Sequence, residues 1–322
     1  MKFKQPDIGA SCTAFAPASV TNLSCGFDVL GLAMEYPGDE VRLTVATEKG
    51  VRIKNIMNNS GSIPLNPEEN CAGFPVCRLY ELYGLEYGIE ISIVKHMGIG
   101  SGLGSSAASA VAAVTAFDAL FKTDLSLTEK LEFAKMGEAI AAGDSVHIDN
   151  IAASMYGGIV LVRDADSLDI IPLDFPATLW CVVLYPRITL RTEEMRNILP
   201  ETVPLRKAVI QWGNLAAFIA GLHQHDMSIV KKAMHDEIIE PVRKTYIPNF
   251  TEAKQIAEKK GAIGTAISGS GPSIASLAES KAHAQAIHDA WTDRFNADGK
   301  KGFIYSSVIN RRGAYVKDMY AE

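Results

Sequence analysis

Apolar and polar residues alternate with a period of two along several short segments, which is typical of half-buried β-strands. In one of them Ile89, Ile91 and Ile93 alternate with polar residues. Other short runs are almost wholly apolar and rich in β-branched side chains, which favours buried strands. The predicted strands are 41–45, 89–94, 158–162, 179–184, 273–278 and 303–309.

Helical patterns lie between these strands. Ser126 and Glu129 have the spacing of a capping box, and the helix that they begin should end before Gly143. Further helices are predicted over 107–121, 206–223, 251–260 and from the cap residue Ser280 to about residue 297. Strands and helices do not alternate strictly, so the pattern predicts an α+β fold. We expect Trp180, Trp212 and Trp291 to be core or packing residues.

The composition describes an ordinary globular chain. It has 322 residues, enough for one large or two medium domains, with 48% hydrophobic and 21% charged residues. The formal net charge of −6 argues against non-specific binding to nucleic acid or to a membrane surface, and we expect neither as a partner.

Targeting signals and cysteine use point to the cytoplasm. The first six residues lack an apolar core, and the longest apolar run, 107–121, is too short and too polar to span a bilayer. The five cysteines are scattered and form no C-x-x-C pair, which indicates reduced thiols and a cytoplasmic location.

A loop rich in glycine and serine joins the predicted strand 89–94 to the helix 107–121. Three glycines and three serines lie within residues 100–106. Glycine lets the backbone approach a bulky anion closely, and the helix that follows directs its first N–H groups and its dipole at that anion. Ser105 and Ser106 add hydroxyl groups and are good helix caps. The segment predicts a phosphate-binding loop.

The common phosphate-loop signatures do not fit this loop. A Walker A motif needs a lysine, and no lysine lies between Lys95 and Lys122. A dinucleotide fingerprint needs a third glycine where Leu103 or Ser105 stands. A flexible linker is disfavoured because the loop lies between a strand pattern and a helix pattern.

The sequence G-L-G-S-S-A-A at 102–108 resembles the phosphate-binding motif of the GHMP kinases. Segments 16–31 and 264–273 fit the same superfamily. Within it, four short motifs resemble the homoserine kinases: Gly26-Phe27-Asp28, His147-Ile-Asp-Asn150, Thr192 with Arg196, and Glu240-Pro-Val-Arg243. Two positions depart from the family pattern. Gly98 replaces a proline, which we expect to loosen the start of the loop, and Arg191 replaces a serine.

The resemblance implies a two-domain α+β architecture like that of the GHMP kinases. Residues 1–165 would hold the nucleotide, and residues 166–322 would complete the substrate pocket at the domain interface. The implied reaction is ATP-dependent phosphorylation of the side-chain hydroxyl of L-homoserine, giving O-phospho-L-homoserine and ADP in threonine biosynthesis. Members of the family are often homodimers, which we expect here as well.

The resemblance assigns the nucleotide and metal sites. It places ATP on Asn70, Gly98, Ile99, Gly100, Ser101, Gly102, Leu103, Gly104, Ser105, Ser106, Ala107 and Ala108. It places Mg²⁺, which prefers oxygen ligands, on Ser106 and Glu138. From the residues alone, Asn70 could equally be a turn residue and Glu138 part of a solvent-exposed helix face.

An amino-acid substrate has an ammonium group, which needs acceptors, and a carboxylate, which needs donors. The acceptors implied are Asn22, Asp28 and Asp149. The donors are Arg196 and Arg243, because guanidinium matches a carboxylate well. Thr192 and His147 would complete the substrate site. The competing interpretation is that both arginines lie on the surface.

The catalytic residues implied are Asp149 and Asn150. Either Asp149 acts as a base, or Asn150 orients the hydroxyl and its proton passes directly to a phosphate oxygen. From the residues alone, Asp149 or Asn150 could instead cap a helix beginning at Ile151.

Two other functions compete with this one. A mevalonate or sugar kinase of the superfamily is disfavoured by the paired arginines together with the acceptors for an ammonium group, a combination that mevalonate does not need. A non-catalytic nucleotide-binding protein is disfavoured by the combination of Ser106, Glu138 and Asn150.

Overall fold

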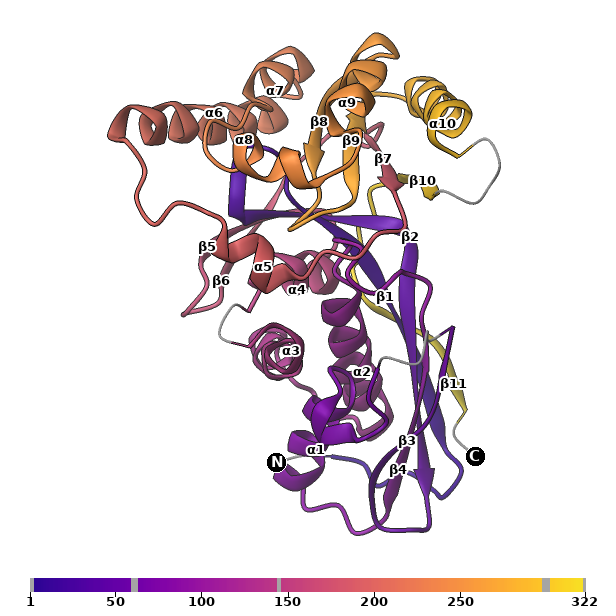
Figure 1. Cartoon of the computed structure of the whole chain (residues 1–322). Coiled ribbons are helices and arrows are strands. Elements are labelled where there is room, and N and C mark those ends of the chain that lie inside the picture. Colours follow the sequence, from indigo (N-terminus) through magenta and orange to yellow (C-terminus); the bar gives the residue numbers. More distant parts are fainter. Residues whose placement is uncertain (1–2, 59–62, 144–145, 297–301, 321–322) are drawn as a thin grey trace.

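The computed structural model describes residues 3–58, 63–143, 146–296 and 302–320. The described strands form two sheets, each with helices packed on one face (Figure 1). The larger sheet makes up the half of the molecule that contains both chain termini, and the smaller sheet makes up the other half. This confirms the predicted α+β fold with an N-terminal and a C-terminal part.

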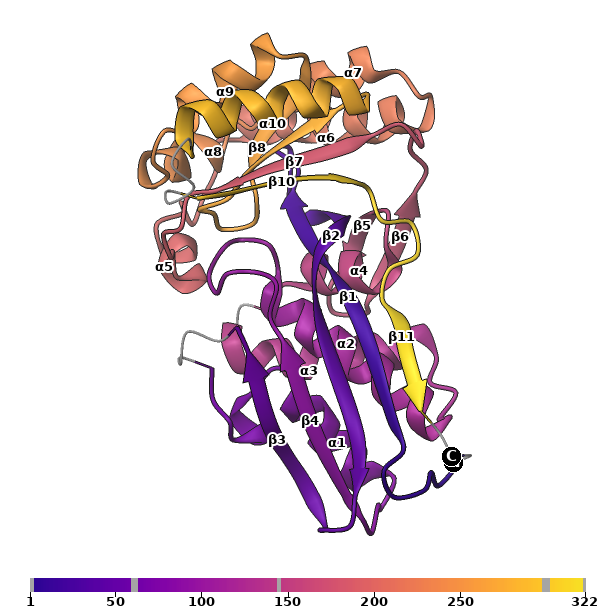
Figure 2. The ribbon, with the colours of Figure 1, turned by 90° about the vertical axis from the view of Figure 1, so that its right-hand side faces the viewer.

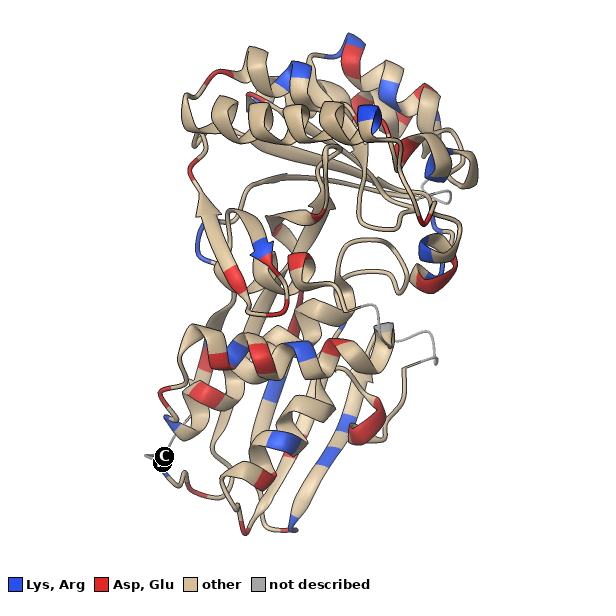
Figure 3. Cartoon of the chain, turned by 90° about the vertical axis from the view of Figure 1, so that its left-hand side faces the viewer, with Lys and Arg blue, Asp and Glu red and all other residues tan. Residues whose placement is uncertain are grey.

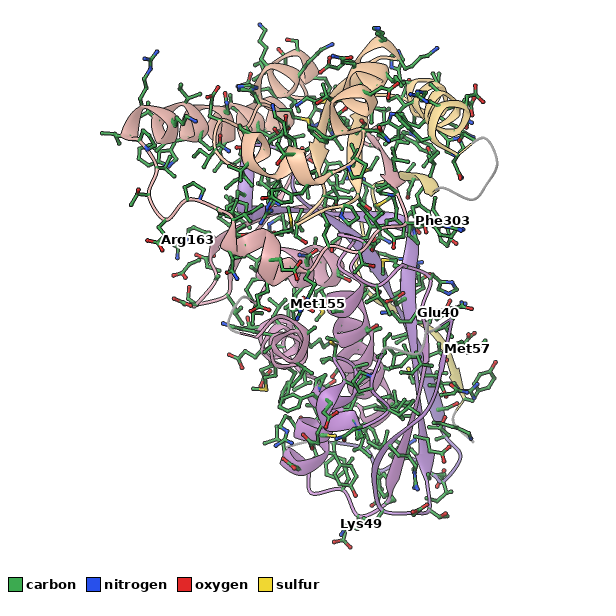
Figure 4. The ribbon with its side chains drawn as sticks, viewed as in Figure 1. Glu40, Lys49, Met57, Met155, Arg163 and Phe303 are labelled. Atoms are coloured by element: carbon green, nitrogen blue, oxygen red, sulfur yellow. The ribbon has the colours of Figure 1, made fainter. Side chains whose placement is uncertain are left out.

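The first sheet has strand order β11-β1-β2-β4-β3, with β5 paired to β2 and β6 paired to β5. Its strands are β1 (Ser11–Asn22), β2 (Gly26–Ala46), β3 (Gly50–Met57), β4 (Gly88–Val94), β5 (Ile159–Asp164), β6 (Asp169–Leu173) and β11 (Tyr315–Tyr320). Helices α1 (Gly73–Leu82), α2 (Ser105–Phe121), α3 (Leu127–Ala142) and α4 (Ile148–Tyr156) lie on one side of it (Figure 2). Lys49, at the turn between β2 and β3, projects from the end of the molecule farthest from the second sheet (Figure 4).

The second sheet is antiparallel, in the order β10-β7-β9-β8. Its strands are β7 (Trp180–Tyr185), β8 (Ala262–Ile267), β9 (Ile274–Ala278) and β10 (Phe303–Val308). The helices of this half are α5 (Thr192–Asn197), α6 (Leu205–His223), α7 (Met227–Ala233), α8 (Glu240–Arg243), α9 (Phe250–Lys259) and α10 (Lys281–Phe295). Two short 3₁₀ turns cover Pro67–Glu69 and Lys244–Tyr246.

The strongest local signals of the sequence are confirmed. The alternating isoleucines form β4. The capping box at Ser126 begins α3, with the Ser126 hydroxyl accepting from the Glu129 amide and the Glu129 carboxylate accepting from the Ser126 amide. Helix α3 ends at Ala142, with Gly143 as its C-cap residue. Helix α2 is buried along most of its length, because its small side chains let it lie close to β1 and β2.

Three local expectations are wrong. Helix α4 begins at Ile148 with His147 at its N-cap, so no helix start at Ile151 is capped by Asp149 or Asn150. Helix α2 is not capped by a serine, because Gly104 occupies the N-cap in a left-handed conformation with φ 64°. Trp291 is fully buried, but Trp212 is 60% exposed and is not a core residue.

Pairing between strands that are far apart in the sequence was not predicted. Strand β1 is buried on both faces, so it shows no alternation. Strand β11 returns from the second half of the chain to pair with β1. The division at 165/166 stays a prediction, although it separates β5 from its partner β6. In the described part of the chain, no helix is long and apolar enough to cross a membrane.

Candidate active site

A cavity of about 830 Å³ lies where elements of the two sheets meet. It is bounded by the glycine-rich loop, the turn after β1, the start of α4, and two segments of the second half around Thr192 and Ser270. Sixteen of the predicted site residues line it: Asn22, Asp28, Asn70, Ile99, Gly100, Ser101, Gly102, Gly104, Ser105, Ser106, Glu138, His147, Asp149, Asn150, Thr192 and Arg243.

The glycine-rich loop has the conformation that its sequence predicts. Gly100, Gly102 and Gly104 have φ values of 64°, 77° and 64°, a region that other L-residues rarely adopt. The first hydrogen bond of α2 is donated by Ala108 to the Gly104 carbonyl at 2.8 Å. The amides of the preceding helical residues therefore have no acceptor within the helix, and two of these residues, Ser105 and Ser106, line the cavity. This is the arrangement that favours a bound anion.

The loop is held by a second glycine-rich loop, residues 268–273, from the other sheet. The Ser268 hydroxyl donates to the Gly102 carbonyl at 2.6 Å, and the Ser273 amide donates to the Ser101 carbonyl at 3.2 Å. A Cβ on Gly102 would lie 2.6 Å from the Ser268 carbonyl oxygen and 2.7 Å from that of Gly271. The contact between the loops therefore requires glycine at position 102.

The looser start of the loop expected at Gly98 stays a prediction, and the contact that Gly98 makes weighs against it. A Cβ at this position would lie 2.6 Å from the Tyr185 hydroxyl. The ring of Tyr185, from β7, thus packs directly on the backbone of Gly98. The tight contact restrains a position where the family pattern has proline.

A buried ion pair lies beneath the first turn of α2. Lys95, at the end of β4, pairs with Asp39 of β2, and both side chains are almost fully buried. Lys95 also donates to the Ser105 carbonyl at 2.9 Å, and Asp39 accepts from the Ser105 hydroxyl at 2.9 Å. This pair fixes the position where the helix starts. Sequence reasoning missed it, because 56 residues separate its two charges.

Glu138 points inward from α3 and is only 5% exposed, so its interpretation as a solvent-exposed helix residue is wrong. Its Oε2 atom is buried and has no hydrogen-bond partner among the described residues. Burial raises the pKa of this carboxyl to about 7, partly offset by a hydrogen bond with Ser106. An unsatisfied carboxylate oxygen beside a hydroxyl provides the hard oxygen donors that Mg²⁺ prefers. Within the described ranges, no group of three His, Cys, Asp or Glu side chains could hold a metal alone.

Opposite charges meet at the far side of the cavity. Arg196, on α5, forms an ion pair with Asp28 at 2.5 Å, and both side chains remain about one-third exposed. Arg243 is 2% exposed, which rules out a surface position for it. It donates to the carbonyls of Met195 and Gly269, and burial lowers its pKa to about 10, so it stays charged at neutral pH.

Phe27 joins these two arginines. The Arg196 and Arg243 guanidinium carbons lie 5.1 Å and 5.2 Å from the centre of its ring, within the range of cation–π attraction. The motif Gly26-Phe27-Asp28 therefore supplies both a carboxylate and an aromatic support for the arginines. Only the carboxylate was predicted as a site residue.

The turn before Phe27 is strained. Asn22, Leu23, Ser24 and Asp28 all have positive φ values between 41° and 71°. Asn22 stabilises this conformation, because its side-chain oxygen accepts from the Asp28 amide at 3.0 Å and its side-chain nitrogen donates to the Gly269 carbonyl at 2.8 Å. Such strain in non-glycine residues concentrates at functional sites.

The start of α4 brings three polar side chains to the cavity. The buried Asn150 side-chain oxygen accepts from the Ser19 hydroxyl at 2.8 Å. Burial raises the pKa of Asp149 to about 7, and the nearby Asp28 charge adds to the rise. Burial lowers the pKa of His147, so its ring is neutral near pH 7, and its Nε2 atom has no partner within the described structure.

Six of the predicted site residues either do not line the cavity or already have partners for their side chain. Asn70 lines the cavity, but its side chain already donates to the Pro64 carbonyl and accepts from two backbone amides. Gly98, Leu103, Ala107, Ala108 and Arg196 are not among the residues that line the cavity, although Arg196 pairs with one that is. Of the residues that sequence reasoning missed, Ser270 lines the cavity, and its hydroxyl lies 3.3 Å from that of Thr192.

Comparison with known proteins agrees with this fold. The model described as GHMP kinases N terminal domain matches residues 74–158, and the model described as GHMP kinases C terminal matches residues 218–297. A solved mevalonate kinase from L. major has the same fold, with a TM-score of 0.74 at 17% identity over 95% of this chain and 99% of that one. The fold and the two family models define a GHMP kinase.

Relatives that match over nearly their whole length identify the family within this superfamily. The homoserine kinase of Chloroherpeton thalassium is 38% identical over 94% of this chain and 98% of its own length. That of Chlorobaculum tepidum is 39% identical over 96% and 94%. The crystal structure of homoserine kinase from Cytophaga hutchinsonii matches with a TM-score of 0.92 and 44% identity, covering 98% and 99% of the two chains. The chain belongs to the homoserine kinase family.

The contact between the two loops predicts the effect of Gly102→Ala. The added Cβ would meet two carbonyl oxygens, and the φ of 77° is unfavourable for alanine. We expect unfolding free energy to fall by about 1–3 kcal/mol and the apparent affinity for ATP to fall with it. Denaturant unfolding and ATP titration measure both. Gly84→Ala is the control, because its φ is also positive but a Cβ there meets nothing within 4 Å in the described structure. Equal effects of the two variants would contradict the role of the contact.

The buried Glu138 carboxyl predicts a pH-dependent stability. Its folded pKa, about 7, lies above the ordinary value of 4.5, so the native state is stabilised by protonation. That stabilisation is complete below about pH 4.5 and is lost as the pH rises toward 7. Glu138→Gln should therefore raise the free energy of unfolding by about 1–3 kcal/mol at pH 8 and much less at pH 5.

The matched control is Glu132→Gln, an exposed position on the same helix. Denaturant melts at both pH values measure the four differences. A gain in stability that is equal at pH 5 and pH 8 would contradict the buried-charge account.

Proposed function

We propose that this chain transfers the γ-phosphoryl group of ATP to the side-chain hydroxyl of L-homoserine, producing O-phospho-L-homoserine and ADP in a step toward threonine. Membership of the homoserine kinase family supports the reaction. The observation that supports an amino-acid substrate is the pair of opposite charges, Asp28 and Arg196, at the same cavity as the glycine-rich loop.

An amino acid also carries one positive and one negative charge, so it can pair with both of these side chains at once. Its ammonium group would replace Arg196 as the partner of Asp28, and its carboxylate would replace Asp28 as the partner of Arg196. Arg243 and the neutral ring of His147 supply further donors for the carboxylate. A ligand with only one of the charges would leave a protein charge without its partner, which is costly in a partly desolvated site.

The phosphates of ATP would lie on the glycine-rich loop and on the first turn of α2. Phosphoryl transfer depends mainly on positioning and on stabilising charge, so the backbone amides at this helix terminus and the fixed loop are the main contribution of the chain. The buried Lys95–Asp39 pair keeps these amides in place. Asn70 would lie beside the adenine ring of ATP.

Ser106 and Glu138 would hold Mg²⁺ together with the phosphates. When bound, the ion neutralises charge on the phosphates. Its fit to the site is supported by the unsatisfied Oε2 atom of Glu138 and by the adjacent Ser106 hydroxyl.

Asp149 and Asn150 would meet the reacting hydroxyl. A carboxyl with a pKa of about 7 exchanges a proton readily near neutral pH, which suits a general base. The Asn150 oxygen accepts from Ser19 and its amide nitrogen donates to Asp149 Oδ1 at 3.4 Å, which leaves its second amide hydrogen to orient the hydroxyl oxygen. The alternative, in which the proton passes directly to a phosphate oxygen, needs only this orienting role.

We also propose that the enzyme works in the cytoplasm, and that residues 1–165 and 166–322 form its nucleotide-binding and C-terminal domains. It would act as a homodimer, without nucleic acid or a membrane as a partner.

A coupled ADP-release assay with Mg·ATP tests the reaction. L-homoserine should be turned over, and D-homoserine, L-serine, mevalonate and galactose should give at most a small fraction of that rate. Turnover of mevalonate or galactose at the rate of L-homoserine would overturn the substrate assignment. ATP binding without turnover of any of the five would favour a non-catalytic protein.

Removing one guanidinium group should weaken use of homoserine specifically. Arg196→Ala should lower kcat/KM for L-homoserine by about 30- to 1,000-fold, the scale of about 2–4 kcal/mol for a lost charge pair. The KM for ATP should not change, because Arg196 pairs with Asp28 and is not among the residues that line the cavity beside the glycine-rich loop. Arg163→Ala is the control, since Arg163 is exposed near the end of β5 and is not among the residues that line the cavity (Figure 4). Unchanged homoserine kinetics in Arg196→Ala would remove this residue from the substrate site.

Asp28→Asn tests recognition of the ammonium group. In the wild type, 4-hydroxybutyrate, which has a carboxylate but no ammonium group, must separate Arg196 from Asp28 and leaves Asp28 without a partner. In the variant Arg196 has no carboxylate partner to lose, so kcat/KM should fall much less for 4-hydroxybutyrate than for homoserine. We expect the preference for homoserine over 4-hydroxybutyrate to fall by about 100-fold. Steady-state kinetics with both alcohols measures the ratio, and an equal loss for both would contradict the account.

A further inference from the structure

Two segments of the chain carry charged groups that would meet the proposed amino-acid substrate. The strained turn 22–28 carries Asp28, and helix α8 carries Arg243 at its last position. Helix α8 has only four residues, so its own hydrogen bonds cannot hold it in place. The contacts that fix these two segments relative to each other therefore decide the spacing between the carboxylate and the guanidinium group.

The side chain of Asp236 holds the start of α8. Its carboxylate accepts from three consecutive amides, those of Ile238, Ile239 and Glu240, at 2.8, 2.9 and 2.9 Å. Amides at the start of a helix have no acceptor within it, so they need a partner from outside. The N-cap residue, Ile239, has an apolar side chain and makes no such bond, and Asp236 takes over this role. Asp236 is only 7% exposed, so water competes little for its oxygens.

Asp236 also lies near the guanidinium group of Arg243. The two residues line the same small cavity, together with Asn22 and Ser24 from the strained turn. Burial lowers the pKa of Arg243, and the negative charges of Asp28 and Asp236 counteract part of that fall. One buried carboxylate therefore supports both the position and the charge of Arg243.

Gln211, on α6, connects the two segments directly. Its side-chain nitrogen donates to the Cys25 carbonyl, in the strained turn, at 3.0 Å. Its side-chain oxygen accepts from the Glu237 amide, next to Asp236, at 3.1 Å. Gln211 is 8% exposed, although glutamine is mostly found on protein surfaces. The amide group thus holds the turn and the segment that leads into α8 at a fixed separation.

The rest of α6 makes this connection with neutral groups. After Lys207 the helix carries no Lys, Arg, Asp or Glu (Figure 3). Besides Gln211, Asn214 bonds to the same segment, by donating to the His235 carbonyl at 2.9 Å. Hydrogen bonds between neutral groups are not screened by salt as ion pairs are, so the connection does not depend on ionic strength.

The two segments also meet on the cavity side. The Gly269 carbonyl accepts from the Asn22 side chain at 2.8 Å and from Arg243 at 3.0 Å, and all three residues line the large cavity. Gln211 and Asp236 are not among the residues that line it. They can therefore act on a substrate only through the residues that they hold.

We propose that Gln211 and Asp236 are positioning residues that fix the separation between Asp28 and Arg243, and that this separation favours the zwitterion of an amino acid. The ammonium and carboxylate groups of an amino acid are bonded to the same carbon atom, so their spacing is fixed and the site must match it. A displacement of about 1 Å in such a site can cost about 100-fold in rate. The inference deepens the proposed function and rests on it.

Replacing Asp236 tests the support of α8. Asp236→Ala should raise the KM for L-homoserine by about 10-fold or more and change the KM for ATP by less than about 2-fold. Asp236→Asn retains an oxygen that can accept from Ile238 and Ile239, so it should recover most of the loss. It also serves as the test variant if Asp236→Ala does not fold.

The matched control is Asp226→Ala. Asp226 caps α7 in the same half of the molecule, where its carboxylate accepts from the Ser228 and Ile229 amides at 2.9 and 3.3 Å. This variant loses a similar set of bonds far from the proposed substrate contacts, so neither KM should change. Steady-state kinetics with each substrate varied in turn measures all the values.

Gln211→Met removes both hydrogen bonds of Gln211 and keeps the length of the side chain. The preference for L-homoserine over 4-hydroxybutyrate should fall by about 10-fold, because a ligand without an ammonium group depends less on the separation between Asp28 and Arg243. Thr265→Val is the control, since it removes a buried hydrogen bond of 2.6 Å to Ser276 within the second sheet. Its preference should equal that of the wild type.

The wild type separates the two claims. If it uses L-homoserine and neither Asp236→Ala nor Gln211→Met changes the homoserine kinetics, the positioning role is overturned and the proposed function is not. An equal rise in the KM for ATP, or the same rise in Asp226→Ala, would also overturn the role, because it would indicate a general loss of structure.

If the wild type does not use L-homoserine, the proposed function fails and crystal structures of the two variants decide the positioning role. The Cys25 carbonyl and α8 should then lie farther apart in the variants than in the wild type. Unchanged positions of both would overturn the inference.

Discussion

The close approach of two glycine-rich loops, one from each sheet, determines the geometry of the whole site. It exists because Gly102 has no Cβ, which lets the carbonyls of Ser268 and Gly271 come within a distance that any side chain would prevent. This contact joins the start of α2, where phosphates would bind, to the half of the molecule that carries Arg196 and Arg243. The buried Lys95–Asp39 pair supports it from below, because it fixes the turn of helix that follows the first loop.

The charged side of the cavity follows a different logic. Asp28 and Arg196 form an ion pair with each other in this structure, and both side chains are partly exposed, so each can exchange its partner for a charged group of a ligand. A zwitterion can replace both halves of the pair at once, so binding need not leave a charge uncompensated. Strain in the turn at 22–28, stabilised by the Asn22 side chain, presents the carboxylate for this exchange. The selectivity of the site for amino acids over neutral alcohols would then arise from the cost of breaking the pair.

Local signals in the sequence predicted much of this, and long-range contacts account for the rest. The capping box at Ser126, the isoleucine alternation of β4 and the glycine spacing of the loop are effects of neighbouring residues, and the structure confirms them. The return of β11 to β1 and the Lys95–Asp39 pair depend on residues far apart in the chain, so no local pattern marks them. Trp212 was expected to be a core or packing residue because large apolar residues usually lie in the core, and its exposure became visible only when the face of α6 was known.

The most direct test is a crystal structure of the protein with L-homoserine and a non-hydrolysable ATP analogue. The account predicts that Asp28 and Arg196 have separated, with the ammonium group on Asp28, the carboxylate on Arg196 and Arg243, and the hydroxyl directed at the terminal phosphate on the glycine-rich loop. An intact Asp28–Arg196 pair with homoserine bound elsewhere in the cavity would contradict it.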